Sequence, residues 1–199
     1  MNCNMPSKTQ INDERLVACF IVSFEKLDGM VADESDPIAM QLAFGTRNKC
    51  GLKQWRPAMI ESDSKELEPI YAQLPARFPP LFERLVLNFR WAEVDLQTFR
   101  LLANPPGPGL GGLLQEMSGD RTIWKQLRQA GYMQFGKGPG GDYDPVCFDT
   151  NSRAGNRDYK IVKIAHEQIL CNDRIKVTAV LAHSFRELML DTIARANRG

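Results

Sequence analysis

The sequence has almost none of the features that mark membrane, secreted or fibrous proteins. No window of about 18 apolar residues occurs in it. Its opening, MNCNMPSKTQINDER, lacks the apolar stretch of about 7 to 15 residues behind a basic start that a signal peptide needs. An Asn-X-Ser/Thr sequon is also missing. We therefore expect a cytoplasmic protein that does not bind a membrane.

Cysteines are few and scattered. The chain has five, Cys3, Cys19, Cys50, Cys147 and Cys171, and none forms a CxxC pair. An odd number at wide spacings predicts neither a disulfide framework nor a zinc knuckle. We expect reduced, buried thiols.

The chain also lacks an excess of charge of either sign. Its 25 basic and 24 acidic side chains nearly cancel, which argues against nucleic acid and anionic membranes as partners. With 199 residues, 43% of them apolar, the composition is that of a globular domain. A chain of this size buries roughly 70% of its unfolded surface, so stability requires no metal or disulfide.

The first half of the chain is predominantly helical in pattern. Apolar residues recur at helical spacing over 12–28, whereas 29–59 predicts an irregular extension. Asp63 and Glu66 have capping-box spacing and begin a short helix that ends at the prolines of PARFPP. The strongly amphipathic segment 81–94 then predicts a helix of about three turns.

The second half is richer in β-branched and aromatic residues. A short strand at 98–104 and a Pro/Gly loop precede a helix at 120–130. Four strands are then predicted, at 131–138, 144–150, 159–165 and 174–182. Short loops between them favour antiparallel pairing. The predicted fold class is α+β, an antiparallel sheet of about four to six strands flanked by helices.

A capped amphipathic helix is predicted at the end of the sequence. Ser184 and Glu187 have capping-box spacing, so Ser184 Oγ should accept from the N–H of Glu187 and the Glu187 carboxylate from the N–H of Ser184. The apolar stripe of this helix is predicted to pack on the sheet. It consists of Phe185, Leu188, Met189 and Ile193, facing strands around Phe135, Val146 and Val162.

Three local patterns resemble ligand-binding motifs but do not match them. In FGKGPGGDYDPVCFD the glycines link two predicted strands, whereas a phosphate-binding loop leads directly into a helix. Asp142, Asp144 and Asp149 lack the rest of a calcium loop. His166 and Glu167 begin an HExxH-like string, but Leu170 stands where the second histidine belongs. We therefore predict no cofactor and no metal.

Two kinds of function remain open. Cys147 and His166, with the nearby aspartates, could form the site of a hydrolase or a metal-dependent enzyme. Alternatively, Trp91, Glu93 and Asp95 combine an aromatic ring with carboxylates, which suits a surface that receives a basic protein. The block from 61 to 120 carries about four more acids than bases, which favours a cationic partner.

The order of segments resembles that of the SUKH superfamily. Three segments carry the likeness: ELEPIYAQLPARFPPLFERLVLNF, GYMQFGKGPGGDYDPVCFDT, and YKIVKIAHEQIL with LAHSFRELML. The family's Asn-Gly-Gly turn is replaced here by RWAEVDL. Bacterial members are similar to immunity proteins that neutralise partner toxins, and fungal members are scaffolds in cell-wall signalling.

The resemblance implies a non-enzymatic protein that acts by binding another protein, such as a toxin domain. It divides the chain into an N-terminal extension, 1–60, and a SUKH-like domain, 61–199, which together form one compact unit. The predicted partner-binding surface consists of Trp91, Glu93, Asp95, Asp142, Tyr143 and Asp144.

Overall fold

The computed structural model describes residues 12–28, 30–154 and 157–198. Cys3 lies outside these ranges, so the prediction for its thiol does too. The described residues form an α+β structure whose main sheet is entirely antiparallel, which confirms the predicted fold class. None of the helices in this part of the chain has the length and apolarity that a bilayer crossing requires.

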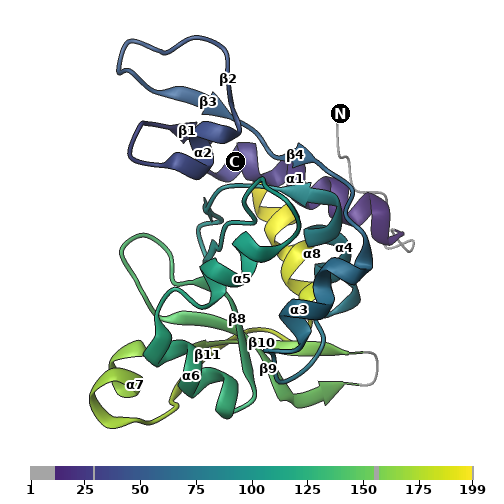
Figure 1. Ribbon diagram of the computed structural model, residues 1–199, viewed down its shortest axis with the longest axis vertical. Helices are drawn as coiled ribbons and strands as arrows, with labels where there is room; N and C mark the ends of the chain where they lie inside the picture. Colours follow the sequence, from purple (N-terminus) through teal and green to yellow (C-terminus); the bar gives the residue numbers. More distant parts are fainter. Residues whose placement is uncertain (1–11, 29, 155–156, 199) are drawn as a thin grey trace.

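Helices and strands are interspersed along the described part of the chain (Figure 1). The helices are α1 (Asp13–Asp28), α2 (Pro37–Gln41), η1 (Ser64–Leu67, a 3-10 helix), α3 (Glu68–Tyr71), α4 (Pro80–Asn88), α5 (Gly111–Met117), α6 (Arg121–Gln129), α7 (His166–Asn172) and α8 (Phe185–Ala196). The strands are β1 (Val31–Ala32), β2 (Ala43–Phe44), β3 (Lys53–Trp55), β4 (Ala58–Met59), β5 (Phe89–Arg90), β6 (Val94–Asp95), β7 (Arg100–Leu101), β8 (Tyr132–Lys137), β9 (Pro145–Ala154), β10 (Asp158–Ile164) and β11 (Val177–Ala182).

The main sheet has six strands in the order β11-β10-β9-β8-β7-β6. Each strand therefore pairs with its neighbour in sequence. Short loops join β6 to β7 and β8 to β9, whereas α5 and α6 lie between β7 and β8, and α7 lies between β10 and β11. A second sheet, β1-β3-β2, lies at the opposite end of the molecule in Figure 1, and β4 pairs with β5. The strands predicted in the second half of the sequence are all present, and β7 supplies the predicted short strand.

Successive side chains along the strands point to opposite faces of the sheet, and both faces are buried. On β9, Phe148 joins the large core and stacks on Phe135, with ring centroids 4.1 Å apart. The side chain of Cys147 points to the other face, where a second core contains residues of α6 and α7. The sheet is thus covered by α8 on one face and by α6 and α7 on the other.

The helix α1 belongs to the large core. Phe20 lies edge-on to Phe185 of α8 at 6.1 Å, and Phe24 lies edge-on to Trp91 at 6.4 Å. All four rings are completely buried. The core therefore crosses the predicted boundary at residue 60.

Capping side chains mark the starts of α6 and α8. Asp120 accepts hydrogen bonds from the N–H groups of Thr122 and Ile123 and begins α6. At α8 the predicted bond from Glu187 N–H to Ser184 Oγ is present at 3.0 Å. The return bond of this capping box differs from the prediction: the Glu187 carboxylate accepts from the N–H of His183, one residue earlier, at 2.6 Å.

Three regions have more regular structure than their sequence patterns predict. The predicted irregular extension 29–59 contains α2 and the three-stranded sheet, whose strands are only two or three residues long. The Gly-Leu-Leu segment after the proline loop forms α5, and His166 begins α7, where the sequence predicts no helix. Such short elements carry too few residues for a periodicity to show in sequence.

The strand β11 forms one edge of the main sheet and contains two irregularities. Ile161 and Val162 of β10 face Ala182 and Val180, so Leu181 is an extra residue on β11. Lys163 and Ile164 likewise face Ala179 and Val177, which makes Thr178 extra. Both irregularities have the pattern of a β-bulge.

Candidate partner-binding site

The loop that joins β8 to β9 contains the glycine-rich string of the sequence. It is closed by a hydrogen bond from Gly138 N–H to Asp144 O, at 2.9 Å, and by a turn in which Asp142 N–H donates to Pro139 O, at 3.1 Å. Asp142 Oδ1 accepts from the N–H of Asp144 at 2.9 Å. A side chain at position 138 would collide with Asp142, since an added Cβ would lie 2.2 Å from its carboxyl carbon. The loop therefore needs glycine at this position to bring Asp142 close.

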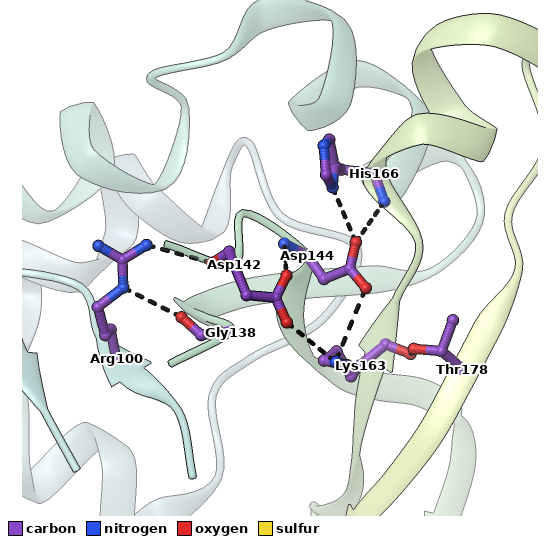
Figure 2. A network of polar contacts seen from close by, with 7 residues as sticks. All are labelled: Arg100, Gly138, Asp142, Asp144, Lys163, His166 and Thr178. Carbon is purple, nitrogen blue, oxygen red and sulfur yellow. Dashed lines mark hydrogen bonds and ion pairs between the residues drawn. The ribbon is translucent and has the colours of Figure 1, made fainter. Parts of the chain in front are cut away.

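Arg100 of β7 fixes this loop to the sheet (Figure 2). Its Nε donates to Gly138 O at 3.0 Å, and its Nη2 donates to Asp142 O at 3.2 Å. Its Nη1 pairs with Glu93 Oε1 at 3.0 Å, while Lys137 Nζ pairs with the other oxygen of Glu93 at 3.1 Å. One guanidinium thus uses the donors of its fork to bind two carbonyls and a carboxylate.

On the other side of the loop, Lys163 and His166 bind the two aspartates (Figure 2). Lys163 Nζ lies 3.0 Å from Asp142 Oδ2 and 3.9 Å from Asp144 Oδ2. Asp144 Oδ1 accepts from the backbone N–H and from Nδ1 of His166, at 2.9 and 2.8 Å. Burial alone would raise the pKa of Asp142, but the Asp144 N–H and the Lys163 ammonium lower it below its ordinary value.

Asp95 connects the loop to the turn between β6 and β7. Its Oδ2 accepts from Gly140 N–H at 3.0 Å, and its backbone N–H donates to Asp28 at the end of α1. Burial raises the pKa of Asp28, and the nearby carboxylates of Asp95 and Glu93 raise it further. The acids at this end of the sheet therefore outnumber the bases that bind them.

Tyr143, which directly precedes the closing residue Asp144, remains exposed. About 64% of its surface is accessible, although Arg100 lies 5.8 Å from its ring centroid and the ring of His166 lies 6.4 Å away. A loop with many glycines thus presents a large aromatic side chain from a fixed backbone.

A groove of about 760 Å³ opens beside Tyr143. Its lining comes from α5, α6, β8, α7 and the loop, and includes Glu116, Ile123, Lys137, Tyr143, His166 and Leu170. Leu170 is half exposed, whereas Ile123 belongs to the core beneath. The groove therefore combines apolar walls with titratable groups.

The structure brings together five of the six residues predicted for the partner surface. Glu93, Asp95, Asp142, Tyr143 and Asp144 lie at one end of the main sheet, connected through Arg100 and the loop. The prediction is wrong for Trp91, because its side chain is completely buried and its indole N–H donates to Leu102 O at 2.9 Å. The residue is part of the core and cannot contact a partner there.

Several residues of this site were missed by the sequence reasoning. Arg100, Lys137 and Lys163 fall on separate strands, and no local pattern relates them. Glu116 lies in α5, which was not predicted as a helix. The alternation of acids in Asp142 and Asp144 was the one available signal, and it placed both residues on the predicted partner-binding surface without indicating the bases that bind them.

The cysteine proposed for the alternative, enzymatic function is unsuited to it. Cys147 is completely buried between β9 and the helices α6 and α7. Burial raises the pKa of its thiol well above the ordinary value, so the nucleophilic thiolate is disfavoured. A catalytic cysteine needs a lowered pKa and access to substrate, and Cys147 has neither.

One group of side chains has the composition of a metal site. Ligand atoms of Asp142, Asp144 and His166 all lie within 4.8 Å of one another. However, the ammonium of Lys163 already contacts both carboxylates, and Nδ1 of His166 is engaged by Asp144. A metal ion would have to displace this lysine and break the histidine hydrogen bond. The charges of the cluster are balanced by protein groups instead.

No protein-family model matches this chain, and no curated protein does.

Proposed function

We propose that this protein is a non-catalytic protein-binding module that binds its partner through Tyr143 and the surrounding loop, residues 138–144. The observation that carries this proposal is an exposed aromatic side chain on a loop held by polar contacts from three strands. Aromatic side chains commonly supply the largest share of binding energy at protein interfaces. A loop that is already ordered also loses less entropy when the partner binds.

The charges around the loop favour binding over catalysis. Arg100, Lys137, Lys163 and His166 each pair with a carboxylate. A network of this kind orients a surface and gives it a charge pattern that a partner can match. The remaining acids, including Asp28 and Glu116, add negative potential that favours a basic partner.

The resemblance to the SUKH superfamily narrows this proposal to an immunity protein that neutralises a toxin domain, or to a regulatory scaffold. We place its action in the cytoplasm, since no disulfide joins the described cysteines. Co-expression with the captured partner distinguishes the two roles: an immunity protein restores growth of cells that the partner inhibits, and a scaffold leaves growth unchanged.

The test is capture of a stoichiometric partner from the native host with three forms of the full chain. The wild type and Phe44→Ala should recover the same protein, whereas Tyr143→Ala should lose it. Phe44 is a matched control because it is also an exposed aromatic residue, located on the small sheet. Loss of a central aromatic anchor should raise the Kd about 30-fold or more. Equal binding by all three forms would remove Tyr143 from the interface, and recovery of no partner would overturn the function.

A metal-dependent enzyme is the alternative, favoured only by the Asp142, Asp144 and His166 group. Calorimetric titration of the wild type with Zn²⁺ and with Mn²⁺ tests it directly. We expect no saturable binding, because Lys163 occupies the space between the carboxylates. A micromolar site that is lost in Asp142→Asn would establish the metal centre and would return the enzymatic function to consideration.

A further inference from the structure

The groove beside Tyr143 contains an acidic side chain that its own surroundings do not neutralise. Among the described residues, no hydrogen bond or ion pair within 4 Å reaches the carboxylate of Glu116. The positive charge of Lys137 acts on Glu116, but its ammonium is paired with Glu93 Oε2 at 3.1 Å. The other acid in the lining, Asp120, is used to cap α6.

The surroundings of Glu116 disfavour its negative charge. The side chain is half-buried on α5. Burial raises the pKa of Glu116, Lys137 lowers it, and the charges of Glu93 and Asp36 raise it again, leaving the pKa above its ordinary value. A cation placed in the groove would remove this unfavourable balance.

We propose that the groove receives an arginine side chain of the partner protein, whose guanidinium binds the Glu116 carboxylate. This inference rests on the proposed protein-binding function and names the chemistry of the partner's contact residue. A guanidinium can give two parallel hydrogen bonds to one carboxylate, and it is more weakly hydrated than an ammonium, so it enters a half-buried site at lower cost.

The walls of the groove suit the rest of an arginine side chain. Its methylene stem can lie along Ile123 and Leu170, which form the apolar part of the lining. At the mouth, the exposed ring of Tyr143 can stack on a guanidinium, as it already does with Arg100 at 5.8 Å.

One base in the lining opposes this arrangement, and its position limits its effect. Arg121 lies in the first turn of α6 and is exposed to solvent. Water and salt screen an exposed charge much more than they screen a half-buried one. The other bases, Lys137 and His166, are engaged by Glu93 and Asp144. The net preference of the groove interior is therefore for a positive group.

The test uses two small probes that have the same shape and different charge. N-acetyl-arginine methylamide is titrated into the full chain and followed by amide chemical shifts, with N-acetyl-citrulline methylamide as the neutral counterpart. The arginine probe should give saturable shifts at Gly119, Tyr143 and Leu170 with a Kd on the order of millimolar, and the citrulline probe should give none. Glu116→Gln should raise the Kd of the arginine probe about tenfold or more. Glu167→Gln removes the same charge from an exposed position on the neighbouring helix α7. This variant should bind the arginine probe as tightly as the wild type does.

Equal binding of both probes, or arginine binding unaffected by Glu116→Gln, would overturn the arginine site. Failure of this site and failure of the binding function give different results. If a captured partner depends on Tyr143 and binds Glu116→Gln as tightly as wild type, the site is wrong and the function stands. If the arginine probe binds at Glu116 and the native host yields no partner, the site stands and the function is wrong.

Discussion

Asp144 holds His166 by two hydrogen bonds to a single oxygen atom. Its Oδ1 accepts from the backbone N–H of His166 at 2.9 Å and from Nδ1 of the same residue at 2.8 Å. His166 is the first residue of α7, and the residue that precedes it, Ala165, provides no side-chain cap. Asp144 therefore caps the helix from the neighbouring strand connection and joins α7 to the Tyr143 loop.

Replacing Asp144 tests this cap. Asp144→Ala should lower the free energy of unfolding by about 1 to 2 kcal/mol, because the His166 N–H loses its acceptor. Asp144→Asn should recover part of the loss, since its amide oxygen can still accept from that N–H. Urea denaturation of both variants measures the difference. Equal losses in the two variants would mean that charge, and not capping, is what Asp144 contributes.

Two glycines of the loop provide a matched pair of substitutions. Gly138→Ala should push the Asp142 side chain away from Lys163, because the new Cβ would lie 2.2 Å from the carboxyl carbon. Gly141→Ala should be neutral, since nothing lies within 4 Å of its added Cβ. We expect a stability loss of about 1 kcal/mol for Gly138→Ala. We also expect weaker binding of the partner by this variant alone, measured by calorimetry.

The accessibility of the cysteines predicts their reactivity. Under native conditions Cys50 and Cys171 should be alkylated rapidly, whereas Cys147 should react only after unfolding. Peptide mapping by mass spectrometry after a short iodoacetamide pulse resolves each site. Fast alkylation of Cys147 in the folded protein would contradict its burial and would revive the nucleophile hypothesis.

The ionised Glu116 should lower the free energy of unfolding at neutral pH. The folded protein holds its pKa above the ordinary value, so the unfolded chain loses the proton first as the pH rises. Stability from this group is therefore present at low pH and is lost as the pH rises from about 4.3 through the raised pKa. Glu116→Gln should be more stable than wild type at pH 7, with the gap narrowing toward about pH 4. Paired guanidinium denaturation curves at the two pH values measure this gap.

The C-terminal helix tests the packing of the main core. Leu188 is buried, so Leu188→Ala should lower the free energy of unfolding by about 2 to 5 kcal/mol through a cavity. Ser184→Ala should cost about 1 kcal/mol, since the Glu187 N–H loses its acceptor. A neutral Leu188→Ala in equilibrium denaturation would contradict the position of α8 against the sheet.

The sequence predicted elements well where the interactions were local, but the helix predicted over 81–94 ends at Asn88, and the strands β5 and β6 follow it. The spacing of Leu188 and Ile193 identified the buried face of α8, and both residues are in the core. The prediction failed where a partner distant in sequence decides the structure. His166 starts a helix because Asp144, on another strand connection, accepts its N–H, and no periodicity records that contact.

The candidate site was predictable in part for the same reason. Asp142, Tyr143 and Asp144 are neighbours in sequence, and turn chemistry alone marked them as a loop. The role of Arg100 depends on the pairing of β7 with β8. This pairing brings Arg100 next to Gly138, which lies 38 residues further along the chain. Trp91 was misplaced because an aromatic residue beside two acids can face either way. Here its ring faces Phe24, a residue of the N-terminal helix.

The two irregularities of β11 also bear on how these molecules behave when they are crowded together. An edge strand of six residues without charge or proline is usually a template for further strands, and its exposed Val177 and Val180 would strengthen that tendency. The extra residues Thr178 and Leu181 interrupt the regular spacing of the outward N–H and C=O groups, so an incoming strand finds no continuous ladder. Removing Leu181 would straighten this edge, and the same surface would then nucleate aggregates at concentrations where the native chain remains dispersed.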